Sequence, residues 1–139
     1  MAITQGMCSS FKEQLLKGEH DFDVNTFKIA LYTSSATLSA ATTVYTTANE
    51  VVGVGYTAGG INLTGATVSL TGTIAFVDFN DAVWTGSTIT ARGALIYNAS
   101  SGNKAVAVLD FGSDKTSTTG DFTVQFPTND SSSAIIRLA

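Results

Sequence analysis

The sequence predicts an all-β protein, an antiparallel β-sandwich of jelly-roll type with one short helix near the N-terminus. Three observations predict this class. Apolar residues alternate with a period of two from about residue 26 onward, as expected for strands. Short turn-forming sequences, TGS, SSGN and TSTTGD, separate these segments. A chain of 139 residues without a βαβ alternation then fits one β-sandwich domain spanning residues 1–139.

The N-terminal segment CSSFKEQLLKGEH predicts a helix at about residues 7–17. An apolar stripe at helical spacing runs through Met7, Phe11 and Leu15. Ser10 and Glu13 have the spacing of a capping box, in which each side chain binds a free N–H group at the helix start. Gly18 can adopt the left-handed conformation that ends many helices.

The strands are expected from about residue 26 onward. The segments with alternating apolar residues include TFKIALY, ATVSL, TIAFVDF and DFTVQFP. The only proline, Pro127, falls at the end of the last of these, where its missing N–H group does least harm. The stretch Thr33–Ala48 is small and polar, and is either a long loop or an extended arm with one edge strand.

The segment Ala91–Phe111 predicts a hairpin with apolar residues on both faces. A strand with one face in water should alternate between apolar and polar residues, and AVAVLDF does not. We therefore expect one face of the hairpin to line the core and the other to meet the helix or a second chain.

The composition is poor in charge and rich in hydroxyl groups. Charged residues make up 13% of the chain, about half the usual share, while Thr contributes 21 residues and Ser 14. The net charge of −4 with seven Lys and Arg argues against a nucleic-acid or anionic-membrane partner. Neither a transmembrane span nor the apolar core of a signal peptide is evident, so we expect a chain that is not secreted. A neutral surface loses little solvation when another protein covers it.

No constellation of residues predicts catalysis, a cofactor or a metal centre. His20 follows the helix, where we expect a solvated turn, and the Asp residues fall mostly at turns. Asp78, Asn80 and Asp81 could face a cation but lack the spacing of a calcium-binding loop. The lone Cys8 is expected to be a small, semi-buried apolar residue, and Trp84 a core residue.

Several segments resemble the small virion proteins of tailed bacteriophages. They are MAITQGMCSSFKEQLLKG, TFKIALYTSSA, TARGALIYN, KAVAVLDFG, GDFTVQFP and AIIRLA. Among these proteins, the chain is most similar in size to the capsid decoration, or cement, proteins. The resemblance implies a non-enzymatic β-sandwich on the outer capsid surface of the virion. There it would bind the major capsid protein as a symmetric oligomer and bridge neighbouring capsomers.

On this interpretation we expect the contacts with other chains to involve Ile3, Thr4, Gln5 and Met7 of the N-terminal segment, and the polar loop near Tyr45. A homodimer is favoured over a trimer, because a two-fold interface is the commonest closed form. Two alternatives remain: a tail or head-fibre domain that binds a host-surface glycan or receptor, and a small hydrolase that uses His20 or two Asp side chains.

Overall fold

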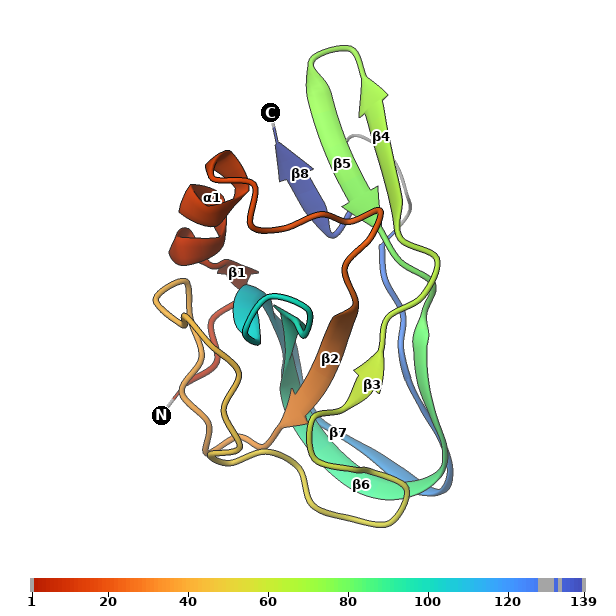
Figure 1. Cartoon of the computed structure of the whole chain (residues 1–139). Helices are drawn as coiled ribbons and strands as arrows, with labels where there is room; N and C mark the ends of the chain where they lie inside the picture. The colour runs from red at the N-terminus through yellow and green to blue at the C-terminus, as the bar shows by residue number, and fades with distance from the viewer. Residues whose placement is uncertain (1, 128–131, 133, 139) are drawn as a thin grey trace.

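The computed structural model describes residues 2–127, 132 and 134–138 and shows a mostly β protein with two antiparallel sheets and one short helix (Figure 1). Strand accounts for 50% and helix for 6% of the structure, which confirms the predicted all-β class. Strand pairing begins at Phe27, close to the expected residue 26, apart from one short strand that precedes the helix.

The first sheet has the strand order β1-β7-β6-β2-β3, and the second has the order β4-β5-β8. The bounds of the first are β1 Gly6–Met7, β7 Lys104–Val124, β6 Ala82–Asn98, β2 Phe27–Tyr32 and β3 Ile61–Asn62. Those of the second are β4 Thr67–Thr71, β5 Ile74–Asp78 and β8 Ile136–Leu138. The predicted jelly-roll arrangement is not confirmed, because within the described residues β6 and β7 stay paired in one long hairpin.

Helix α1 spans Ser9–Leu16, shorter at its start than the predicted 7–17. Met7 is in β1 instead, because it pairs with β7, and Cys8 then takes the N-cap position in extended conformation. The predicted capping box is therefore wrong: Ser10 lies inside the first turn, and its buried hydroxyl has no hydrogen-bond partner. The helix end is as predicted, with Gly18 at φ 71° and its N–H group 3.1 Å from the Leu15 carbonyl oxygen.

One face of the β6–β7 hairpin packs against α1 and the segment that follows it. The Phe11 ring meets the His20 ring at a centroid distance of 4.9 Å, and Phe22 stacks on Phe27 at 4.3 Å. The Asn98 side chain of β6 reaches His20 across this layer. The helix therefore covers one face, which was one of the two expectations.

The opposite face is covered by the β2–β3 loop, residues 33–60, rather than by a second chain. Tyr45 of this loop stacks on Tyr97 of β6 with a centroid distance of 4.7 Å. The Tyr32 hydroxyl of β2 donates to the Thr46 carbonyl oxygen at 2.6 Å. Leu38, in the stretch expected to be small and polar, is 1% exposed and forms a bridge with Ile3. Both faces of the doubly apolar hairpin are thus buried within one chain.

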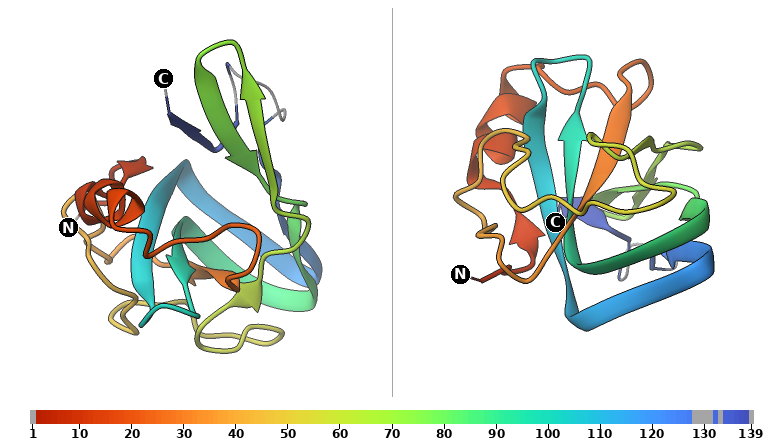
Figure 2. Two further views of the ribbon diagram at one scale, coloured as in Figure 1. Left: turned by 45° about the horizontal axis from the view of Figure 1, so that its top comes forward. Right: turned by 90° about the horizontal axis from the view of Figure 1, so that it is seen from below.

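The outer half of the β6–β7 hairpin bends away as a curved ribbon (Figure 2). The register between the strands shifts on both sides of Ser87, as in a β-bulge. The Ser87 hydroxyl lies 2.8 Å from the Ser117 hydroxyl, 3.0 Å from the Gly120 carbonyl oxygen and 3.2 Å from that of Trp84. This buried serine contact satisfies polar groups that the bulges leave out of the ladder. Trp84 itself is buried, as predicted.

Candidate interaction surfaces

A buried glutamate fixes the β2–β3 loop against the first sheet. Glu50 is 8% exposed, and three donors surround its carboxylate. The Tyr45 hydroxyl donates to Oε1 at 2.6 Å, while the Tyr56 hydroxyl and the Gly59 N–H group, at 2.8 Å, donate to Oε2. The Tyr97 hydroxyl donates to the Gly59 carbonyl oxygen at 2.6 Å and ties the loop to β6. Buried charge of this kind is tolerated when its oxygens are hydrogen-bonded.

Electrostatics keep these phenols in their neutral, donating form. Burial, followed by the charge of Glu50, raises the pKa of Tyr97 to about 12. Burial and the hydrogen bond to Glu50 also raise the pKa values of Tyr45 and Tyr56. Since both carboxylate oxygens already accept hydrogen bonds, the cluster is built to hold the loop rather than to accept a substrate proton.

The loop approaches the sheet closely where it rejoins β3. Gly60 has φ 76°, and a Cβ atom there would overlap the carbonyl oxygen of Ile29 in β2. Only glycine accommodates both the left-handed conformation and this contact. The stretch GVGYTAGG, residues 53–60, therefore connects the loop to β3.

The expectation that His20 lies in a solvated turn is wrong. The side chain is 7% exposed, because the segment after α1 folds back over Phe11 and β6. Asn98 Nδ2 donates to His20 Nδ1 at 3.0 Å, which leaves Nε2 to donate its hydrogen to Gln14 Oε1 at 2.8 Å. Burial, helped by the charge of Lys104, lowers the pKa of His20, while Glu19 opposes the shift. With both nitrogens engaged, His20 fills a structural role.

The acidic side chains do not converge on a cation site. Asp81 Oδ1 accepts the Phe126 N–H group at 3.0 Å, and Asn80 Nδ2 donates to Thr64 Oγ1 at 3.3 Å. Asp78 is buried, its Oδ1 has no hydrogen-bond partner, and burial raises its pKa. Across the described parts of the chain, no three His, Cys, Asp or Glu side chains gather in a metal-binding group.

Two exposed apolar surfaces lie at opposite ends of the molecule, one on the β2–β3 loop and the other on the β4–β5–β8 sheet (Figure 1). The first, the loop surface, consists of Val52 and Val54, which are 94% and 70% exposed. The second, the sheet surface, is one face of the β4–β5–β8 sheet. The strand registers place the following residues on that face: Val68, Leu70, Ala75, Val77, Ile136 and Leu138.

The sheet surface is buried at its base and open at its outer end. Val77 and Ile136 are buried, whereas Leu70 is 71% exposed and Val68 51%. A groove of about 160 Å³ runs between this face and the residues Leu15 and Phe22. Exposed apolar residues that gather on one face, rather than singly, mark interaction sites.

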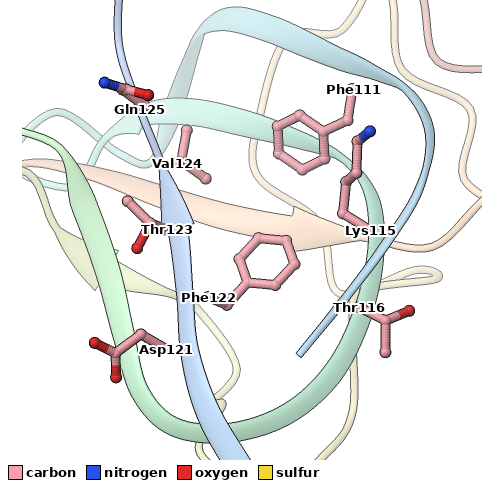
Figure 3. A pocket seen from close by; sticks show the side chains of 8 residues that line it. All are labelled: Phe111, Lys115, Thr116, Asp121, Phe122, Thr123, Val124 and Gln125. Carbon is pink, nitrogen blue, oxygen red and sulfur yellow. The ribbon is translucent and has the colours of Figure 1, made fainter. Parts of the chain in front are cut away.

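A hollow of about 370 Å³ lies on the concave side of the bent β6–β7 ribbon (Figure 3). The Phe111 and Phe122 rings face it, with centroids 6.3 Å apart. Lys115, Asp121 and Gln125 add polar groups at its rim. Aromatic rings beside polar side chains can stack against a sugar ring and bind its hydroxyl groups.

The predicted contact residues are distributed between the interior and the surface. Ile3 is buried, Met7 is half-buried opposite Ala107, and Tyr45 is half-buried in the Glu50 cluster. Thr4 and Gln5 are exposed, and Gln5 Oε1 accepts the Asp110 N–H group at 3.1 Å. Contact of these five residues with another chain stays a prediction. The only sequence signal for the loop surface is the apolar run VVGV at residues 51–54, which has neither a strand nor a helix period.

The only α-helix in the described part of the chain, α1, has eight residues, and no helix there is long and apolar enough to cross a membrane. Comparisons of the chain with the models of known protein families, with curated proteins and with solved structures give no match.

Proposed function

We propose that this chain is a non-enzymatic structural protein of a bacteriophage virion, a capsid decoration protein. It binds the outer surface of the shell and bridges neighbouring capsomers. The resemblance of its segments to small virion proteins suggests the class. The observation that carries the proposal is the pair of uncharged apolar surfaces at opposite ends of the molecule.

Bridging requires two contact surfaces, and the two surfaces described here are held in place by different parts of the structure. The loop surface is fixed by Glu50, so little conformational entropy is lost when its valines bind. The second sheet, which carries the sheet surface, extends beyond the core. Burial of apolar area contributes about 25 cal/mol per Å², so a few hundred Å² at each end stabilise a contact by several kcal/mol. A shell repeats that contribution at every equivalent position.

The major capsid protein is the partner that this proposal requires, and a homodimer is the oligomer it favours. Each copy needs one surface for the shell and one for a neighbour. We assign the loop surface to the shell, because its valines stand on the loop that Glu50 fixes to the sheet. The neutral surface chemistry fits a protein partner better than a nucleic acid or an anionic lipid.

The test is binding to expanded, undecorated capsids of the encoding phage. Purified protein should co-sediment with them to saturation and should raise the temperature at which the shell breaks. The double variant V52D/V54D should lose co-sedimentation, because it places two charges on the loop surface. Val24→Asp is the matched control, since Val24 is 75% exposed but lies outside both surfaces. Binding without a gain in shell stability, or no saturable binding, would contradict the proposal.

The hollow beside Phe111 favours a second candidate function, a fibre domain that binds a host-surface glycan. This alternative expects a ligand on a glycan array, and loss of that ligand in the variant Phe111→Ala. Capsid binding with no glycan bound would reject it, whereas glycan binding that depends on Phe111 without capsid binding would replace the decoration proposal.

A further inference from the structure

Within the described residues, strand β4 leaves one edge of the second sheet open. It pairs with β5 on one side, and no described residue pairs with its other side. An open edge presents unpaired N–H and C=O groups that can bind another strand. Proteins protect such edges by keeping them short or by placing a charge, a proline or a bulge there.

Four strands end the two sheets in the described chain, and of these only β4 lacks such protection. The outer ribbon of β6 and β7 is also open at its sides, but its register shifts on both sides of Ser87 and β7 carries charged residues there. β1 and β3 have two residues each, and β8 has three, one of which is Arg137. β4 has five residues, Thr67–Thr71, with the sequence TVSLT and no charge or proline. Its register with β5 is continuous over all five residues. β4 is therefore the longest of the four strands that end the sheets, and its uninterrupted register makes it the one best shaped to accept a strand.

The sequence of β4 is complementary to itself in antiparallel pairing. Read in either direction, TVSLT gives a hydroxyl residue, an apolar residue, a serine, an apolar residue and a hydroxyl residue. With Ser69 opposite Ser69 of a second copy, Val68 lies opposite Leu70, and Thr67 opposite Thr71. All five residues are then paired, and each hydroxyl residue faces a hydroxyl residue while each apolar residue faces an apolar one.

A two-fold axis through Ser69 also keeps the sheet surfaces of the two copies on the same side. Val68 and Leu70 of each copy, now 51% and 71% exposed, become cross-strand neighbours of their counterparts. Cross-strand apolar pairs each contribute a few tenths of a kcal/mol to about 1 kcal/mol, in addition to the main-chain hydrogen bonds. The second sheet, which has three strands in one copy, becomes a sheet of six.

We propose that two copies of this chain pair through β4, antiparallel and centred on Ser69, to form one continuous sheet across a two-fold axis. A second copy is the occupant because the strand is self-complementary in pattern and free of charge, so no like charges meet at the axis. This interface supplies the homodimer of the proposed function, but it forms in the free protein and does not depend on a capsid.

The first test measures the mass of the free protein by sedimentation from about 1 µM to about 1 mM, a range that covers weak to moderate dimers. The wild type should pass from monomer to dimer. V68K/L70K should stay monomeric, because four cations meet across the axis. V68K/L70E should dimerise again, because the introduced cation of each copy then faces the introduced anion of the other. Both positions are exposed, so the fold should tolerate these changes.

The second test fixes the register by oxidation of the variant Ser69→Cys. Residues opposite each other in antiparallel strands have Cα atoms about 4.5–5.5 Å apart, within the range a disulfide spans. Cys8 gives little background, because it is fully buried and burial raises its thiol pKa to about 11. The control is Thr118→Cys, an exposed position on β7. Ser69→Cys should form a disulfide-linked dimer at least tenfold faster than the control.

A wild type that stays monomeric at all concentrations overturns the proposal, and so does a dimer that V68K/L70K leaves intact. If the monomer still binds capsids and V68K/L70K weakens that binding, the edge pairs with a shell strand instead, and the second-copy assignment is wrong. If the dimer forms as described but no capsid binding is found, the proposed function fails while this interface stands.

Discussion

The inner half of the β6–β7 hairpin and the β4–β5–β8 sheet deal with apolar side chains in opposite ways. In the hairpin, residues 94–97 and 105–109 are all buried, with α1 on one face and the β2–β3 loop on the other. In the second sheet, Val68 and Leu70 remain exposed, and burial on their face is confined to its base, at Val77 and Ile136. The hairpin, whose strands are apolar on both faces, is therefore buried, whereas the second sheet, whose strands alternate in the ordinary way, exposes apolar side chains.

The difference teaches that apolar residues on both sides of a strand do not by themselves indicate an oligomer. The chain supplies its own cover through a polar-looking loop, held by one carboxylate and a group of tyrosines. Exposed apolar surface is found instead where a regular strand projects past the core. Candidate interfaces are therefore better sought at unpaired sheet edges than at the most apolar segment of the sequence.

The same truncation in the two regions should separate them most clearly. Leu95 in β6 is fully buried, so Leu95→Ala should lower the free energy of unfolding by about 3 kcal/mol. Leu70→Ala in β4 should lower it by less than about 0.5 kcal/mol, because the side chain is exposed. Both values are measured by denaturant unfolding of dilute protein. Equal losses would mean that the second sheet is covered in the monomer.

Loss of the carboxylate should release the loop that closes the hairpin. Glu50→Ala leaves two phenols and the Gly59 N–H group without their acceptor, and should lower the free energy of unfolding by about 2–3 kcal/mol. Glu13→Ala is the matched control, because Glu13 makes only an exposed pair with Lys17 and should have an effect near zero. A Glu50 variant as stable as the wild type would show that the loop does not depend on this cluster.

The smallest expected effect is a dependence of stability on pH that arises from His20. Because burial lowers its pKa below the ordinary 6.5, the folded state favours neutral His20. Its contribution is present above pH 6.5 and is lost as the pH falls through that region, since the unfolded chain then binds more protons. The melting temperature should therefore be lower at about pH 5.5 than at about pH 7.5.

His20→Gln is the control for that measurement, because glutamine keeps hydrogen-bonding groups but does not titrate in this range. It should reduce the difference between the two melting temperatures. Glu19 and Lys104, which face His20 and pair with each other, are the same in this variant and in the wild type, so they cannot account for a change between the two. An unchanged difference in the variant would assign the pH dependence to another group.

Local patterns predicted the local features of this fold. The period of two located most strand segments and put Val68 and Leu70 on one face, and Gly18 ended the helix as expected. The turns predicted at TGS and TSTTGD are wrong, because these sequences lie inside β6 and β7. What could not be predicted depends on contacts between distant segments. The Glu50 cluster joins residues of a loop to β6, and His20 is buried only because the chain folds back over it. A bulge between Ile96 and Tyr97 changes which side chains of β7 share a face.

The serine contact at the bend of the β6–β7 ribbon has a mechanical consequence. Ser87 and Ser117 connect the two strands where the ladder is interrupted, beside the buried ring of Trp84. A soft joint at that point would let the outer ribbon swing and dissipate a pull applied to it. Because buried hydroxyl groups close this joint, we expect it to resist bending and to pass such a pull on to the residues packed around Trp84.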